Sequence, residues 1–343
     1  MKPPLTYYGG KTRIAENIAN LLPAHTHYVE PYGGSLSVLL AKTPSRMETV
    51  NDVDHDLMCF WQVLRNQPDE LERLCALTPH SRAELTLANQ PLEDLSDLER
   101  ARRVWVRLTQ GRAGTLRNTG WRHYIDGGTS SISMPRYLTG YQSRFAPVAE
   151  RLRQVSLECQ PALNLITEYG SKRTNLLYVD PPYPTATGRI RNYKHEMARE
   201  EDHRDLAEAL HSCQATVVIS GYVNDLYDGQ LYPDWYRREL AASTTNATGD
   251  HSRIEVLWSN RPLEITDEPT LALTDTFHDN QTGFCDETMR RCNGCATPIY
   301  QARTGRPRKY CTPACKTAHH RSRLRCSPHP SGAHRTIVVP GRN

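Results

Sequence analysis

The chain has 343 residues, which is long enough for one sizeable α/β domain and a smaller appended unit. Its 42 Lys and Arg against 38 Asp and Glu give a net charge of only +4, which singles out no class of partner. The opening residues lack the apolar run of a signal peptide, and no segment approaches the roughly 18 apolar residues of a membrane span. We therefore expect a cytoplasmic protein with no membrane partner.

Short apolar segments alternate with turns along much of the chain. Apolar residues recur at helical spacing over residues 12–22, and Pro23 ends this pattern. Five further apolar segments predict strands, at residues 28–29, 49–50, 176–179, 216–219 and 254–258. This alternation predicts an α/β fold with a mostly parallel sheet, whose ligands lie beyond the carboxyl ends of the strands.

Residues 66–150 depart from the alternation, and we expect them to form an inserted, mainly helical subdomain. Between residues 101 and 149 there are eight arginines and one acid, interleaved with Trp and Tyr. Such a mixture suits a nucleic-acid surface, although a solvated basic face would have the same composition. The residues expected to contact DNA are Arg112, Arg117, Trp121, Arg122, Tyr124 and Arg136.

The sequence Asp180-Pro181-Pro182-Tyr183 directly follows the apolar segment at 176–179. Methylation of an amino group requires acceptors that grip the amine hydrogens and aim the nitrogen at the methyl donor. Asp180 offers a carboxylate and Pro181 a backbone carbonyl, while Pro182 stiffens the turn and Tyr183 presents a ring to an extruded base. These four residues are the candidate catalytic group, and the alternative is a proline turn that only closes a buried strand.

Three further features precede DPPY in the chain: YYGGK at residues 7–11, EPYGGS at residues 30–35, and Asp52 after the second predicted strand. In content and order, these motifs and DPPY resemble the Dam-like family of DNA adenine methyltransferases over roughly residues 3–260, in the α-type arrangement. The resemblance implies a Rossmann-like S-adenosylmethionine-dependent methyltransferase fold. It also implies site-specific methyl transfer from S-adenosylmethionine to the N6 amine of a flipped-out adenine in double-stranded DNA. Three DNA contacts are implied in the segment after DPPY, at Arg189, Tyr193 and Lys194.

The same resemblance implies which residues contact the cofactor. They lie in the opening YYGGK, in the EPYGG loop, after the second strand and in DPPY, namely Tyr7, Gly9, Gly10, Lys11, Glu30, Pro31, Tyr32, Gly34, Asp52 and Asp180.

Several positions depart from the family pattern. Leu36 replaces the last glycine of the loop that begins at Glu30, which leaves the path of that loop open. Ala162 and Leu163 stand where relatives have an acidic and aromatic pair, so no residue is assigned to the adenine of the cofactor. Asp54 is interpreted as a helix cap and His203 as a structural histidine.

Six of the ten cysteines lie in the last 60 residues. Cys292-x2-Cys295 and Cys311-x3-Cys315, fifteen residues apart, have the spacing of a tetrahedral zinc site. The segment resembles a small treble-clef-like zinc finger, and the alternative is a set of reduced, metal-free thiols. Residues 288–343 carry 12 basic and no acidic side chains, so this part would also bind phosphates.

The predicted cofactors are S-adenosylmethionine and one structural Zn²⁺, and the predicted partner of the monomer is double-stranded DNA. The protein would act either with a cognate restriction endonuclease or without one. The expected source is a bacterium, phage or prophage. One alternative function is methylation of cytosine N4 or of an RNA base. Another is a non-catalytic, zinc-bearing DNA-binding protein on a degenerate methyltransferase fold. The expected parts are a methyltransferase domain in two segments (1–65 and 151–261), the DNA-recognition insert (66–150), an acidic linker (262–288), the zinc finger (289–326) and a disordered tail (327–343).

Overall fold

The computed structural model describes residues 1–124, 132–183, 197, 199–244, 251–263, 289–291, 298–300, 315 and 317. The chain divides into two units, residues 1–273 and 274–343. In the second unit, β8 (Met289–Arg291) pairs antiparallel with β9 (Pro298–Tyr300). Within the described ranges, no helix has the length and apolar character needed to cross a membrane. The predicted tail and nearly all of the predicted linker and zinc finger lie outside the described residues.

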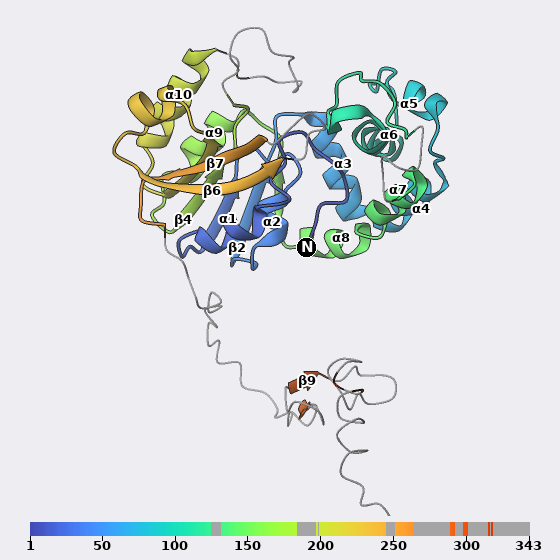
Figure 1. The fold of residues 1–343 in the computed structure, drawn as a ribbon, viewed down its shortest axis with the longest axis horizontal. Coiled ribbons are helices and arrows are strands. Elements are labelled where there is room, and N and C mark those ends of the chain that lie inside the picture. Colours follow the sequence, from blue (N-terminus) through green and yellow to red (C-terminus); the bar gives the residue numbers. More distant parts are fainter. Residues whose placement is uncertain are drawn as a thin grey trace, which may run out of the picture. The chain divides into compact units, whose positions relative to one another are not determined.

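A seven-stranded sheet in the order β3-β2-β1-β4-β5-β7-β6 forms the centre of the first unit (Figure 1). The first five strands in this order are parallel, and β7 and β6 are antiparallel additions at one side. The prediction of an α/β fold with a mostly parallel sheet is therefore confirmed, whereas β3 and β6 were not predicted. The strands are β1 (His27–Glu30), β2 (Met47–Asn51), β3 (Ser156–Glu158), β4 (Asn175–Val179), β5 (Thr216–Tyr222), β6 (Tyr236–Thr244) and β7 (His251–Ser259).

Side chains of successive strand residues enter two separate hydrophobic clusters, because strand residues alternate between the faces of a sheet. Leu176 and Tyr178 of β4 belong to one cluster, and Leu177 and Val179 belong to the other. Every residue of β4 is buried, as expected for a strand covered on both faces. The first face is covered by α1 (Ala15–Leu21), α2 (Ser37–Ala41) and α3 (His55–Asn66), and the second by α9 (Ala162–Tyr169) and α10 (Glu200–His211).

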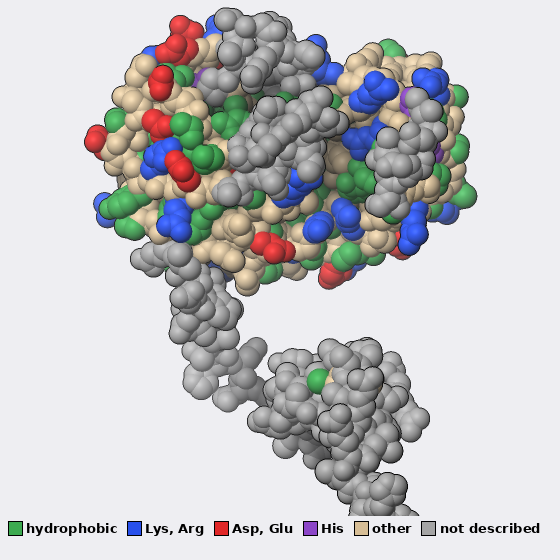
Figure 2. Space-filling view, in the orientation of Figure 1, with side chains coloured by type: hydrophobic (Ala, Val, Ile, Leu, Met, Phe, Trp, Pro, Cys, Tyr) green, Lys and Arg blue, Asp and Glu red, His purple; other side chains and the backbone are tan. Residues whose placement is uncertain are grey.

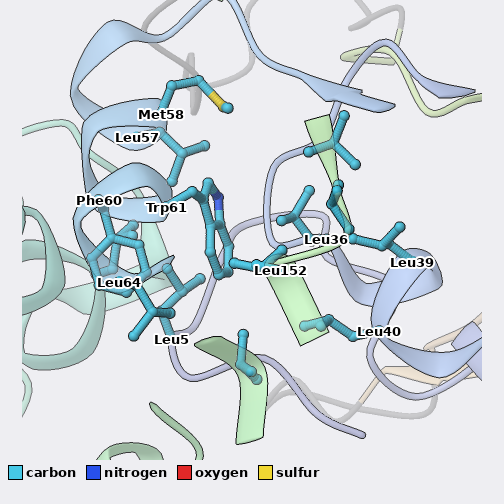
Figure 3. Packing of buried hydrophobic residues seen from close by; sticks show 14 of the residues in the cluster. Leu5, Leu36, Leu39, Leu40, Leu57, Met58, Phe60, Trp61, Leu64 and Leu152 are labelled. Atoms are coloured by element: carbon cyan, nitrogen blue, oxygen red, sulfur yellow. The ribbon is translucent and has the colours of Figure 1, made fainter. Parts of the chain in front are cut away.

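Helix α3 connects the sheet to the helices that follow it in the chain. Figure 3 shows Trp61 of α3 with Phe60 on one side and Leu36 and Leu152 on the other. The indole Nε1 of Trp61 donates a hydrogen bond of 3.1 Å to the carbonyl of Gly34, so α3 also fixes the loop after β1.

The described part of the region after α3 is mainly helical and belongs to the same unit as the sheet. Helix α6 lies at its centre, beside α5 (Figure 1), and Trp105 of α6 packs edge-on against Phe145 of α8 at 6.1 Å. The Trp105 Nε1 also donates to the carbonyl of Pro4, which ties the N-terminal segment to these helices. They are α4 (Pro68–Leu77), α5 (Arg82–Ala88), α6 (Asp97–Gln110), α7 (Met134–Gln142) and α8 (Phe145–Leu152).

Candidate active site

A pocket of about 450 Å³ opens beyond the carboxyl ends of β1, β2 and β4. Residues distant in sequence meet here because parallel strands bring their carboxyl ends to one edge of the sheet. The lining includes every residue expected to contact the cofactor: Tyr7, Gly9, Gly10, Lys11, Glu30, Pro31, Tyr32, Gly34, Asp52 and Asp180. Apolar residues that the sequence left unassigned also line it, namely Val53, Pro161, Ala162 and Leu163.

The loop after β1 follows a path that needs left-handed backbone conformations. Gly34 has φ +49°, and a Cβ at this position would lie 3.1 Å from the ring of Tyr7, so close packing of these residues requires glycine. Leu36 has φ 54° and ψ 29°, also left-handed, although it is not glycine. This answers the question left open by the sequence: the leucine adopts the conformation that a glycine would favour, at a cost of about 1 kcal/mol.

Asp52 is held in place by two backbone amides. The N–H of Gly34 donates to Oδ2 and the N–H of Asp54 donates to Oδ1, both at 2.9 Å. These two bonds fix the orientation of the Asp52 carboxylate where it lines the pocket.

Asn51, the last residue of β2, joins three of the loops that form the pocket. Its side-chain amide donates to the carbonyls of Pro31 at 2.9 Å and Gln160 at 3.0 Å, and its Oδ1 accepts from the Gln160 N–H at 2.9 Å. Its own carbonyl accepts from the N–H of Gly33 at 2.7 Å. The side chain is fully buried. Sequence reasoning missed this residue, and its place directly before Asp52 was the one available signal.

Asp180 accepts hydrogen bonds from several neighbours. The Nζ of Lys11 lies 2.7 Å from both carboxylate oxygens, and the hydroxyls of Ser220 and Tyr183 donate to Oδ1 at 2.9 and 3.0 Å. Burial lowers the pKa of Lys11, but the carboxylates of Asp180 and Glu255 outweigh this and raise it overall, so Lys11 is an ammonium. Lys11, expected to contact the cofactor, therefore also binds the candidate catalytic carboxylate.

Glu255 of β7 completes this group, and sequence reasoning missed it. Its carboxylate accepts a short hydrogen bond from the Tyr183 hydroxyl and lies 3.5 Å from the Lys11 Nζ. Burial raises the pKa of Glu255. The only available signal was an acid inside the apolar segment at residues 254–258.

Glu30 lines the pocket from the end of β1 and is buried. The hydroxyl of Tyr28 donates to its Oε2 at 3.0 Å. Burial raises the pKa of Glu30 to about 8 despite that hydrogen bond, so the carboxyl group holds a proton at neutral pH.

Two residues interpreted as structural make the expected local contacts. Asp54 caps α3 by accepting from the N–H groups of Asp56 and Leu57, although it also lines the pocket. His203 is fully buried between the Tyr227 hydroxyl and the Met197 carbonyl, each 2.9 Å from a ring nitrogen, and burial lowers its pKa.

Most of the residues expected to contact DNA lie on or near the surface of the helical region, away from the pocket lining. Trp121 is half-buried and stacks with His80 and His123, at centroid distances of 4.4 and 5.0 Å. Arg122 is also half-buried and donates to the Tyr137 hydroxyl at 2.6 Å. Exposed residues of the set are Arg112, Arg117, Tyr124 and Arg136, whereas Arg189, Tyr193 and Lys194 lie outside the described residues.

Residues 111–121 connect this helical region to the pocket. The carbonyl of Gly114 accepts a 2.7 Å hydrogen bond from the N–H of Tyr8, next to Tyr7 and Gly9 in the pocket wall. On the face shown in Figure 2, Lys and Arg side chains gather over the helical region, whereas Asp and Glu are more frequent over the sheet region.

Comparisons with known proteins agree with this geometry. The model of the D12 class N6 adenine-specific DNA methyltransferase family matches residues 7–104 and 134–246. The chain is 23% identical over 277 residues to the Type II methyltransferase M.MjaIII of Methanocaldococcus jannaschii, covering 73% of this chain and 94% of that protein. It is 24% identical over 252 residues to the DNA adenine methylase of Escherichia coli K12, covering 68% of this chain and 84% of that protein. The structure of a methyltransferase from Geobacter sulfurreducens aligns with 74% of this chain, over 80% of its own length. The sequence identity is 11% and the TM-score is 0.30.

Proposed function

Because the chain belongs to the D12 class of N6 adenine-specific DNA methyltransferases, we propose a specific division of labour among its pocket residues. The protein methylates the N6 amine of adenine in DNA at specific sites, with S-adenosylmethionine as methyl donor. Family membership favours this activity over the alternatives of N4-cytosine methylation and of a non-catalytic DNA-binding protein. The main support for these roles is that Asp180 and the residues expected to contact the cofactor line the same pocket.

The donors, acceptors and apolar surfaces of the pocket fit S-adenosylmethionine. The Asp52 carboxylate lines the pocket and is oriented by two backbone amides, and we assign it to the two ribose hydroxyls, the role that an acid after the second strand has in other nucleotide-binding folds. Glu30 and the loop after it face the methionine half. Val53 and Leu163 are exposed apolar side chains in the pocket lining, and we assign them to the adenine ring.

In the reaction, S-adenosylmethionine supplies an electrophilic methyl group. Asp180 and the Pro181 carbonyl accept the amine hydrogens of an adenine that has left the duplex stack, which directs the nitrogen lone pair toward the methyl carbon. The nitrogen–carbon bond forms as the carbon–sulfur bond breaks, and the nitrogen then loses one proton to Asp180 or water. Pro182 fixes the turn, and the ring of Tyr183 packs beside the base.

Recognition of double-stranded DNA is assigned to residues 66–150. The exposed side chains of Arg112, Arg117, Tyr124 and Arg136 support this role, since phosphate and base contacts need cationic and aromatic groups at the surface. Trp121 and Arg122 are half-buried, and we propose that they hold this surface in place and make fewer direct contacts with DNA. Arg189, Tyr193 and Lys194 remain proposed DNA contacts from the resemblance.

The C-terminal cysteines Cys292, Cys295, Cys311 and Cys315 are proposed to bind one structural zinc ion. Their spacing is the support for this assignment. Among the residues that the structure describes, no group of three or more His, Cys, Asp or Glu side chains is placed to hold a metal, and of the four cysteines only Cys315 falls within that set. The proposal further includes a cytoplasmic monomer, with or without a cognate restriction endonuclease.

Two matched variants test the division of labour. We expect Asp52→Ala to weaken S-adenosylmethionine binding about 10- to 100-fold, since it removes charged hydrogen bonds. Asp180→Asn should leave that affinity within about threefold but lower methyl transfer at least about 100-fold, through loss of the amine acceptor. Calorimetry gives the first quantity and a single-turnover assay gives the second. The exposed Asp69→Asn serves as control, and a loss of cofactor affinity in Asp180→Asn equal to that in Asp52→Ala would contradict these roles.

A further inference from the structure

Glu255 is a buried acid beside the catalytic group that the mechanism above does not use. It lies within β7, opposite Tyr222 of β5 and Leu240 of β6, and is 2% exposed. A buried carboxylate is costly unless it is paired or hydrogen-bonded. Its partners here are the Tyr183 hydroxyl and, at 3.5 Å, the Lys11 ammonium, both of which also contact Asp180.

The Oδ1 atom of Asp180 has more donors around it than it can accept well. Lys11, Ser220 and Tyr183 all lie within 3.0 Å of this one oxygen, and Lys11 lies 2.7 Å from Oδ2 as well. A carboxylate oxygen has two lone pairs, so three donors already exceed its capacity. If the target amine is to donate to Oδ1 of Asp180, at least one of these donors must bond elsewhere.

Two of these donors have another polar partner, since the Ser220 hydroxyl lies 3.0 Å from the Tyr178 hydroxyl and the Tyr183 hydroxyl contacts Glu255. Of the two hydroxyls, Tyr183 is the one whose other partner is a carboxylate. Its hydroxyl has a single hydrogen, and both Asp180 and Glu255 lie within its reach. Burial raises the pKa of Glu255, but the Lys11 ammonium 3.5 Å away favours its ionised form. A hydrogen bond to an ionised acceptor is about twice as strong as one to a neutral acceptor, so the carboxylate of Glu255 competes effectively for this hydrogen. Its negative charge also attracts the Lys11 ammonium away from exclusive contact with Asp180.

We propose that Glu255 is a positioning residue for methyl transfer, which draws the Tyr183 hydroxyl off Asp180 and so leaves a carboxylate oxygen available to the adenine amine. The inference rests on the proposed role of Asp180 as acceptor of that amine. Glu255 itself does not touch the base or the cofactor; it acts through Tyr183 and Lys11.

The first variant is Glu255→Gln, which keeps the size of the side chain and a neutral acceptor but removes the charge. We expect the single-turnover rate at saturating S-adenosylmethionine and DNA to fall about 100-fold, because misplaced hydrogen bonds at a reacting group cost that much. The dissociation constants of both ligands should stay within about threefold. Glu239→Gln is the matched control, since Glu239 lies on the adjacent strand β6, is exposed and contacts Arg237; it should react at the wild-type rate.

The second variant separates positioning from support of the fold. Removal of the competing hydroxyl by Tyr183→Phe in the Glu255→Gln background should raise the rate above that of Glu255→Gln alone. If Glu255 had a purely structural role, the double variant should instead react more slowly than Glu255→Gln, since two damaging changes would slow the enzyme further. A double variant as slow as, or slower than, Glu255→Gln would overturn the inference.

The outcomes distinguish this inference from the proposed function. A wild-type protein that forms no N6-methyladenine would refute both, whereas an active wild type with a fully active Glu255→Gln would refute only the role of Glu255. If Glu255→Gln does not fold, Glu255→Asp takes its place: it keeps the charge but is one carbon too short to hold the Tyr183 hydroxyl. The same loss and the same rescue by Tyr183→Phe are then expected, and their absence would overturn the inference.

Discussion

Glu30 shows how burial changes the chemistry of a single motif residue. The end of β1 places its carboxyl group in the pocket wall, where the Tyr28 hydroxyl is its neighbour. Burial raises the pKa of Glu30 to about 8, well above the 4.5 of an exposed glutamate. The protonation state of this group therefore links the stability of the protein to pH.

The sign of that linkage follows from the two pKa values. Below pH 4.5 the carboxyl group is protonated in both folded and unfolded chains, so it adds no penalty. As pH rises from 4.5 to about 8, the unfolded chain ionises while the folded chain must keep the proton, and stability falls by on the order of 1 kcal/mol per pH unit. Above about 8 the penalty levels off.

Urea unfolding of the cofactor-free protein at pH 5, 6.5 and 8 tests this. The free energy of unfolding of the wild type, relative to Glu30→Gln, should decrease across the series, because the glutamine variant lacks the titrating group and cancels the contribution of all others. A constant difference between the two proteins would show that Glu30 ionises normally.

At the residue scale, the sequence predicts what lies in contiguous motifs and misses what depends on distant partners. All ten expected cofactor contacts line the pocket, since each lies at the end of a strand, in the loop that directly follows a strand, or near the start of the chain. Glu255 lies 72 residues from Tyr183, and no local pattern marks it. Leu36 shows a different limit of sequence reasoning. Because the family pattern has glycine at this position, the sequence alone could not predict the backbone path of the loop. In the structure the leucine is buried and its backbone is left-handed.

At the scale of elements, the pocket depends on loops that are braced against one another. Asn51 bonds the loop after β1 and the segment after β3, so one side chain sets the spacing between the wall that holds Asp52 and the wall that holds Ala162. Four of the five parallel strands, β1, β2, β4 and β5, were predictable, because apolar segments and turns mark them. Strand β3 was not, since its three residues are only partly buried and show no apolar run.

We expect Asn51→Ala to weaken both the fold and cofactor binding. It leaves buried backbone groups of Pro31 and Gln160 without their side-chain partner, which costs about 2 to 4 kcal/mol of stability. The loosened loops should weaken S-adenosylmethionine binding at least about tenfold at a temperature where the variant is folded. Thermal unfolding and calorimetry measure the two effects. Asn66→Ala, at an exposed asparagine of α3, is the control. If Asn51→Ala bound S-adenosylmethionine with wild-type affinity, the hydrogen bonds of Asn51 would not shape the site.

At the scale of the whole molecule, the two units invite different tests. The first unit contains the sheet, the pocket and the described helices, while the basic residues and paired cysteines of residues 288–343 lie in the second. Charge and cysteine content change abruptly near residue 288, which predicts a separate part there. Composition could not supply the function of the second unit, since cationic residues bind phosphates without specifying a role.

We expect the double variant Cys311→Ser, Cys315→Ser to lose about one bound zinc ion per chain, because two of four ligands cannot hold the metal. DNA affinity should fall about tenfold through loss of phosphate contacts, with S-adenosylmethionine affinity unchanged. Elemental analysis, fluorescence anisotropy and calorimetry measure these quantities. Cys326→Ser is the matched control and should keep the metal. Equal losses of DNA and cofactor affinity would contradict a separate role for this unit.

The most direct test of the central claim is the identity of the methylated nucleoside. The purified protein is incubated with unmethylated genomic DNA and labelled S-adenosylmethionine, with the Asp180→Asn protein in parallel, and the DNA is digested to nucleosides and separated. The account predicts label in N6-methyladenine with the wild type and at least about 100-fold less with the variant. Label in N4-methylcytosine, or equal label in N6-methyladenine from the Asp180→Asn protein, would contradict it.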